Sequence, residues 1–117
     1  TVVGGFEKQT LSKKSLTITG TGEQRRDFTN VKDICSALVS MSKDTWSGEV
    51  FNLGTGENHS INELAAMYKN DVKYIEARPG EAWTTLADIS KTRKLLGWNP
   101  KTKLQNYVTD WLIQEFK

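Results

Sequence analysis

The chain has 117 residues, of which 37% are hydrophobic and 26% charged, and its formal net charge is +2 at pH 7. These values are typical of one folded domain with a modest core, and the nearly balanced charge makes a weakly basic nucleic-acid binder the least favoured function class. No stretch has the length and apolarity of a membrane span and no leader-like pattern opens the chain, so we expect a cytoplasmic protein that does not bind a membrane.

The first elements are expected to be a helix followed by a strand. Residues 1–14 fit a helix, although Gly4 and Gly5 weaken that pattern. Residues 15–19 alternate apolar and polar side chains, and the glycines of residues 20–22 provide a turn. A short strand and a tight bend follow from this pattern.

The next stretch predicts an extended segment, a helix and another strand. Residues 26–31 can be extended, after which the apolar residues of 31–39 recur at helical spacing behind Asn30, a suitable helix cap. Cys35 is the single cysteine and falls among these apolar positions, so we expect it to be a small buried side chain. Residues 50–53 are apolar enough for a short strand.

The third stretch contains the clearest helix start in the sequence. Ser60 and Glu63 have the spacing of a capping box, in which each side chain binds the backbone amide of the other. Residues 72–75 then predict a strand, residues 78–80 a turn, and residues 84–87 a second extended segment.

The last stretch predicts two helices. The first, over residues 89–96, is capped by Asp88 or Ser90 and ends at Gly97. The second, over residues 104–116, has a broad apolar stripe that must pack against another element.

Alternating strands and helices predict an α/β fold. Three or four short strands and about five helices are too few for a complete doubly wound sheet. We therefore expect a small α/β piece that forms a single domain over residues 1–117.

Two Gly-Thr-Gly-Glu segments, at residues 20–23 and 54–57, each follow a predicted strand. Backbone amides in such turns can bind phosphate. A dinucleotide-binding loop would need a third glycine, and that position holds Arg25 after the first segment and His59 after the second. We interpret both segments as ordinary turns, with no cofactor bound by this chain.

Few residues suggest chemistry by themselves. His59 is the only histidine and has no neighbouring ligands at metal-binding spacing, so neither a metal site nor a hydrolytic triad is expected. Arg26 and Arg78 could hold a diphosphate through paired charge-assisted hydrogen bonds, although composition and position alone favour a solvated surface arginine in each case. Trp83, close behind Arg78, could stack on a ring.

Read in order, several motifs resemble the C-terminal part of the extended short-chain dehydrogenases, the NAD-dependent epimerases and dehydratases of nucleotide sugars. The motifs are Gly-Thr-Gly-Glu-Gln-Arg-Arg-Asp-Phe at residues 20–28, Phe-Asn-Leu-Gly-Thr-Gly at 51–56, Arg-Pro-Gly-Glu at 78–81, Asp-Ile-Ser-Lys at 88–91 and Leu-Leu-Gly-Trp at 95–98. The resemblance covers essentially the whole chain and implies the substrate-binding portion of a Rossmann-type enzyme.

The resemblance also implies roles for particular residues. Arg26 and Arg78 match the arginines that hold the ribose and diphosphate of the nucleotide, and Ile61 resembles the apolar residue that lies against the nucleoside. Thr85 stands where some relatives have a tyrosine, so a ring contact there is not expected.

Catalysis in this family needs a glycine-rich NAD loop and a tyrosine four residues before a lysine. The residues four positions after Tyr68, Tyr74 and Tyr107 are valine, arginine and tryptophan, so the chain carries no catalytic residues of this type. The resemblance thus implies the nucleotide-sugar-binding part of an NAD- or NADP-dependent epimerase, inactive alone, with an N-terminal Rossmann domain as partner.

Three points stay open. The parent could be a nucleotide-sugar dehydratase or reductase, or the chain could be a non-catalytic binding or assembly module derived from the family. The coding sequence upstream of Thr1 would distinguish a module from an enzyme. Self-association into a homo-oligomer through exposed apolar faces is a further hypothesis.

Overall fold

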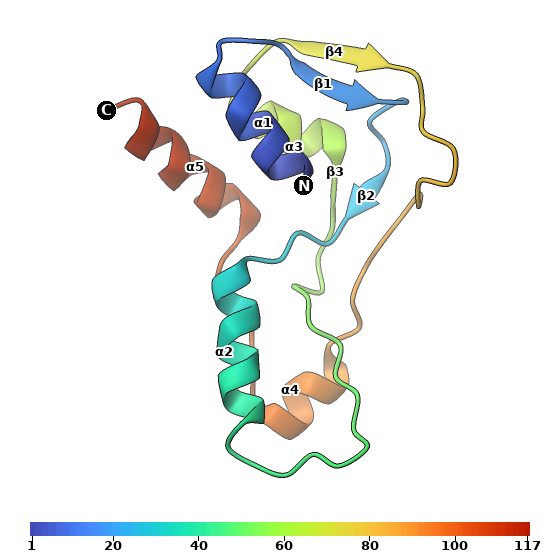
Figure 1. Ribbon diagram of the computed structural model, residues 1–117, viewed down its shortest axis with the longest axis vertical. Coiled ribbons are helices and arrows are strands. Elements are labelled where there is room, and N and C mark those ends of the chain that lie inside the picture. The colour runs from blue at the N-terminus through green and yellow to red at the C-terminus, as the bar shows by residue number, and fades with distance from the viewer.

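The computed structural model describes residues 1–117 as a flat molecule of 48 × 38 × 16 Å. Its five helices and four short strands confirm the predicted α/β class. Two lobes are joined by a narrow waist (Figure 1). We call residues 1–28, 59–85 and 104–117 the upper lobe, and residues 30–58 and 86–103 the lower lobe.

The upper lobe packs three helices beside a two-stranded parallel sheet. Its helices are α1 (Val2–Leu11), α3 (Ile61–Tyr68) and α5 (Leu104–Glu115), and its sheet pairs β1 (Leu16–Thr19) with β4 (Val72–Ile75). Nine buried residues form its core: Phe6, Leu16, Ile18, Ile61, Leu64, Ala65, Tyr68, Leu104 and Val108. The stripe on α5 therefore packs as the sequence required.

The start of α3 confirms the predicted capping box. The Glu63 amide donates to Ser60 Oγ at 3.0 Å, and the Ser60 amide donates to the Glu63 carboxylate at 2.8 Å. These bonds satisfy two amides that a helix start leaves free, and so fix where α3 begins.

A second pair of strands lies at the lower edge of the upper lobe, next to the waist. The two-residue strand β2 (Arg25–Arg26) pairs antiparallel with β3 (His59–Ser60). Residues 78–87, which we call the strap, run beside the other edge of β2, where the Arg25 amide donates to Trp83 O and the Thr85 amide donates to Arg25 O. The predicted extension at 84–87 is thus limited to a bridge between Arg25 and Thr84.

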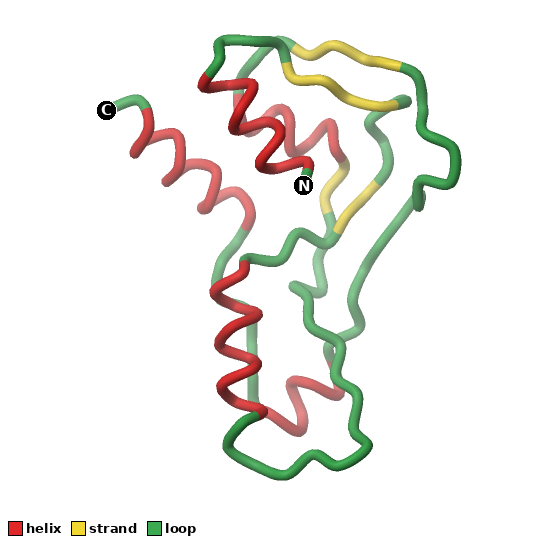
Figure 2. The backbone as a smooth tube through the Cα atoms, viewed as in Figure 1, coloured by secondary structure: helices red, strands yellow, loops and turns green.

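The lower lobe contains α2 (Val31–Met41), α4 (Ser90–Leu96) and long connecting loops, which the tube of Figure 2 shows in green. Its buried apolar residues are Ala37, Ile89 and Trp98. Trp98 Nε1 donates to Asp33 O at 3.1 Å and to Ser36 Oγ at 2.8 Å, which ties α4 to α2.

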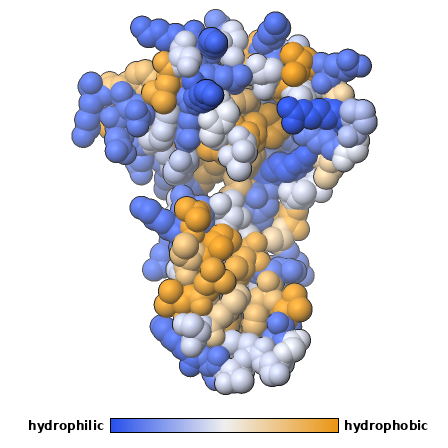
Figure 3. Space-filling view, viewed as in Figure 1, coloured by the Kyte–Doolittle hydropathy of each residue, from blue (hydrophilic) through white to orange (hydrophobic).

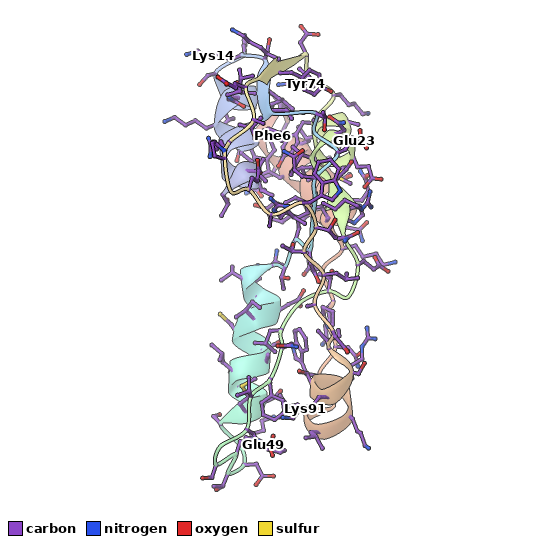
Figure 4. The ribbon with its side chains drawn as sticks, turned by 90° about the vertical axis from the view of Figure 1, so that its right-hand side faces the viewer. Phe6, Lys14, Glu23, Glu49, Tyr74 and Lys91 are labelled. Atoms are coloured by element: carbon purple, nitrogen blue, oxygen red, sulfur yellow. The ribbon has the colours of Figure 1, made fainter.

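At the far end of the lower lobe, the loop after α2 is held by an aromatic and charged cluster (Figure 4). Lys91 forms an ion pair with Glu49, and its ammonium group lies 5.2 Å from the ring centroid of Phe51. The rings of Phe51 and Trp46 meet edge to face at 5.2 Å. Such contacts add to the small apolar core of this lobe.

Two expectations about the lower lobe were wrong. Residues 50–53 form no strand, because no neighbouring strand pairs with them. Cys35 is exposed, because α2 packs against α4 through Asp33 and Ala37 and turns its apolar stripe outward. The predicted extended segment at 26–31 also pairs only at Arg26.

The outward stripe of α2 is the main apolar surface of the lower lobe. Val31, Leu38 and Val39 are 70%, 55% and 59% exposed. Figure 3 shows apolar side chains gathered over the lower lobe, where Figure 1 places α2. A face of this kind marks an interaction surface.

No helix of the chain has both the length and the apolar character needed to cross a bilayer.

Candidate functional site

The largest pocket of the molecule, with a volume of about 770 Å³, lies in the upper lobe between α1, β1, β2 and the start of the strap. Its lining includes Arg26, Ile61 and Arg78, the three residues that the sequence singled out. These residues are far apart in the chain, and the pairing of β2 with β3 on one side and the strap on the other brings them to one cavity.

Arg26 is held by the protein on one side of its guanidinium group. Nη1 donates to Arg25 O at 2.8 Å, and Nη2 lies 3.2 Å from the Glu81 carboxylate. The side chain is 23% exposed, so part of it still faces solvent in the pocket. A guanidinium group fixed in this way is oriented to receive an anion.

Glu81 links the strap to two other elements at the pocket wall. One carboxylate oxygen pairs with Arg26 and the other accepts a hydrogen bond from Thr19 Oγ1 at 3.2 Å. Glu81 ends the Arg-Pro-Gly-Glu motif, but no sequence signal distinguishes it as a site residue. Its partner Arg26 is 55 residues away, so no local pattern reveals the contact.

Arg78 differs from Arg26 in having no partner. It is exposed, and its side chain makes no hydrogen bond or ion pair within the protein. The turn behind it is tight, with Glu81 N donating to Arg78 O and Gly80 at φ +77°. The pocket therefore combines one fixed and one free guanidinium group.

Ile61 forms part of the apolar wall. It is 5% exposed and begins α3, and its amide donates to Gln24 O at 3.1 Å. Phe6 and Ile18 lie in the same lining and the same core cluster. The pocket thus has an apolar side opposite its charged rim, as sites for organic ligands commonly do.

Gln24 is a second lining residue that the sequence analysis missed. It is 4% exposed, and its Nε2 donates to Thr19 O at 2.8 Å. A buried glutamine in a loop between two short strands gives no periodic signal, so only the folded structure identifies it.

The second Gly-Thr-Gly turn binds a carboxylate side chain of the same chain. The amides of Thr55 and Gly56 donate to the Asp27 carboxylate at 2.9 and 3.1 Å, and Thr55 Oγ1 donates to it at 2.6 Å. Gly54 is required here, because an added Cβ would lie 2.4 Å from Ala87 Cβ.

The first Gly-Thr-Gly turn is closed by a side chain. An added Cβ at Gly22, which has φ +77°, would lie 2.0 Å from Asn62 Oδ1, and Asn62 Nδ2 donates to Thr21 O at 3.0 Å. The amides of the second turn are thus bound by Asp27, whereas Asn62 lies against the first turn and bonds to its carbonyl group.

Two other residues considered in the sequence lie outside this pocket. Trp83 is 64% exposed on the strap and contributes its carbonyl to β2 rather than its ring to the cavity. His59 lies 3.6 Å from the Glu63 carboxylate at the start of α3. No three histidine, cysteine, aspartate or glutamate side chains come together in a way that could hold a metal ion.

A family model described as GDP-mannose 4,6 dehydratase matches residues 2–77. A putative UDP-glucose 4-epimerase of Methanocaldococcus jannaschii is 33% identical over 95% of this chain and 38% of its own length. The chain belongs to the nucleotide-sugar epimerases and dehydratases. It is a C-terminal portion of an extended short-chain dehydrogenase, as the resemblance implied.

Other members of this family agree in sequence and in shape. UDP-glucuronic acid decarboxylase 1 of Danio rerio is 34% identical over 89% of the chain and 26% of its own length. The crystal structure of a UDP-glucuronic acid 4-epimerase from Bacillus cereus, in complex with UDP-glucuronic acid and NAD, superposes with a TM-score of 0.87. That structure is 32% identical and covers 98% of this chain, which spans 40% of the epimerase.

Proposed function

We propose that this chain is the nucleotide-sugar-binding portion of an NAD-dependent epimerase of nucleotide-diphosphate sugars. The observation that carries the proposal is that Arg26, Arg78 and Ile61 share one pocket of about 770 Å³. Two guanidinium groups suit a diphosphate, and an apolar wall suits the nucleoside that is joined to it. Epimerases that bind UDP-sugars are among the relatives with the same fold.

The two arginines have different tasks in this proposal. Arg26 is preorganised, because Arg25 O and Glu81 already fix its guanidinium group. Arg78 is free to move onto the ligand, since nothing in the chain competes for it. A fixed group lowers the entropic cost of binding, and a free group adjusts to the position of the phosphates.

This portion is inactive alone in our proposal. It carries no tyrosine four residues before a lysine, neither Gly-Thr-Gly segment has the third glycine of a dinucleotide loop, and Asp27 binds the amides of the second. NAD would supply hydride transfer in the full-length protein, bound by residues outside this chain. The relatives include a decarboxylase as well as epimerases, so a nucleotide-sugar decarboxylase or dehydratase is the second candidate for the parent enzyme.

The partner we propose is an N-terminal Rossmann domain. The chain spans 38% of its Methanocaldococcus relative, and the apolar face of α2 lacks a covering element. Residues 50–53, which have strand character but no strand partner, lie in the same lobe. A domain that covers α2 and pairs with residues 50–53 would account for both features.

The test compares Arg26→Ala and Arg78→Ala in the full-length protein, with UDP as the ligand in calorimetric titrations. Each substitution should weaken binding by about tenfold or more, because a charge-assisted pair with a phosphate is lost. Arg93→Ala is the matched control, since Arg93 lies on α4 in the lower lobe and bonds to Asn99. Unchanged affinity in both pocket variants would overturn the proposal.

A further inference from the structure

Asp27, the residue directly after Arg26, joins three parts of the chain through one carboxylate. It receives hydrogen bonds from the turn at residues 54–56 and also from the Ala87 amide at 3.2 Å. Its own amide donates to Thr85 Oγ1 at 3.3 Å. Asp27 is thus bound to the strap at two points and to the lower lobe at a third.

The strap depends on few attachments for its position. Towards its start, only the Glu81 carboxylate reaches the body of the protein, through Arg26 and Thr19. Its middle is joined to β2 by the backbone bonds of Arg25, and its end is fixed at Asp27 and by Asn58 Nδ2, which donates to Thr85 O at 3.2 Å. The segment that carries Arg78 and Glu81 to the pocket is therefore placed by β2 and by the residue that follows it.

From this geometry we infer that Asp27 is a positioning residue for the nucleotide pocket, which acts by fixing the end of the strap and, through it, the placement of Arg78 and Glu81 beside Arg26. The inference rests on the proposed function of the pocket, which Asp27 itself does not line. The ligand concerned is the diphosphate of the nucleotide.

The electrostatics of the group are consistent with this role. Burial raises the pKa of the Asp27 carboxyl, but hydrogen bonds from Thr55, Ala87 and Gly56 together lower it below its ordinary value. The carboxylate is therefore charged at neutral pH, and its bonds to the turn and the strap are of the stronger, charge-assisted kind.

Asp33 provides a matched comparison within the same chain. Its carboxylate accepts two backbone amides, those of Lys101 and Thr102, both at 3.0 Å, where Asp27 accepts three, and Asp33 is buried where Asp27 is half-buried. Those amides belong to the segment between α4 and α5, which takes no part in the pocket. Loss of either carboxylate should reduce stability, but only Asp27 is connected to the strap.

The experiment compares Asp27→Asn with Asp33→Asn in the full-length protein, at a temperature where thermal unfolding shows both variants to be folded. Hydrogen exchange measures the protection of the strap amides at Glu81, Thr85 and Ala87, and titration measures the affinity for UDP. In Asp27→Asn we expect faster exchange across the strap and UDP binding about fivefold weaker or more. In Asp33→Asn both measurements should match the unsubstituted protein.

Three outcomes would overturn the inference. The first is that Asp27→Asn binds UDP with an affinity within twofold of that of the unsubstituted protein. This result would leave the proposed function intact. The second is an equal loss in both variants, which would reduce Asp27 to a contributor to global stability. The third is failure of the unsubstituted protein to bind UDP, and only this result would remove the proposed function as well.

Discussion

The two lobes solve the same packing problem to different degrees. The upper lobe buries nine core residues between three helices and a parallel sheet, whereas the lower lobe buries three and leaves the apolar stripe of α2 exposed. Helices α2 and α5 both have apolar stripes in the sequence, but only α5 finds a partner within the chain. An apolar stripe in the sequence predicts that a helix packs against an apolar surface, and the structure shows whether that surface belongs to the same chain.

This difference indicates that the upper lobe is stable through its own core, whereas the lower lobe needs a covering partner. The pocket lies in the upper lobe, whose core is sufficient to hold Arg26 and Ile61 in place. The lower lobe presents a surface, and polar contacts such as those of Trp98 with α2 and of Lys91 with the loop after α2 hold its elements together. Three pairs of substitutions test this contrast and the contacts on which it depends.

The largest effect is expected for Leu64→Ala, because Leu64 is fully buried in the core of the upper lobe. Removing its side chain should lower the free energy of unfolding by about 3 kcal/mol. The matched variant Leu38→Ala, on the exposed face of α2, should change it by less than about 0.5 kcal/mol in the 117-residue chain.

Denaturant unfolding of both variants provides the measurement. Leu38→Ala should cost more in the full-length protein than in the 117-residue chain if an N-terminal domain covers α2. Equal costs for Leu64→Ala and Leu38→Ala in the 117-residue chain would contradict the contrast between the lobes.

An intermediate effect is expected at the first Gly-Thr-Gly turn. Gly22→Ala places a Cβ against Asn62 at a residue with φ +77°, and should cost about 2 kcal/mol. Gly80→Ala has the same φ but no atom within 4 Å of the added Cβ, so it should cost about 1 kcal/mol. Thermal unfolding of the two variants should rank Gly22→Ala as the less stable one.

The smallest effect concerns pH and the waist between the lobes. The pKa of the Asp27 carboxyl is lower in the folded protein than its ordinary value of 3.8. Its contribution to stability is therefore complete above pH 3.8 and is lost as the pH falls towards the lower folded value.

The free energy of unfolding, measured between pH 6 and about pH 2, should therefore fall less steeply in Asp27→Asn than in the unsubstituted chain. Asp88→Asn is the control. The Asp88 pKa is also lowered, by hydrogen bonds from Ser90, but that carboxyl lies on the surface and should contribute less. A steeper decline in Asp27→Asn would contradict the assigned direction.

Local signals predicted most of the elements. The Ser60 capping box, the Gly97 helix end and the stripe of α5 depend on residues within a few positions of one another, and all three are found in the structure. The family motifs also selected Arg26, Arg78 and Ile61, which the structure brings to one pocket. Their role in binding a ligand stays a prediction.

Contacts between distant segments could not be predicted in the same way. The roles of Asp27 and Glu81 depend on partners that lie tens of residues away in the chain. The predictions for Cys35 and residues 50–53 were wrong for a related reason. Apolar character predicts burial or strand pairing, but it does not show whether the contacting segment lies in the same chain.

The flatness of the molecule also limits the chemistry that can take place on it. At 16 Å, the thin dimension exceeds the width of a single α-helix by only a few ångströms, so the chain can form one wall of a chamber but cannot enclose one. A sugar held against this wall would remain in contact with bulk water on its outer side. Under the proposed function, the dry site that hydride transfer requires would therefore have to be completed by a second wall outside this chain.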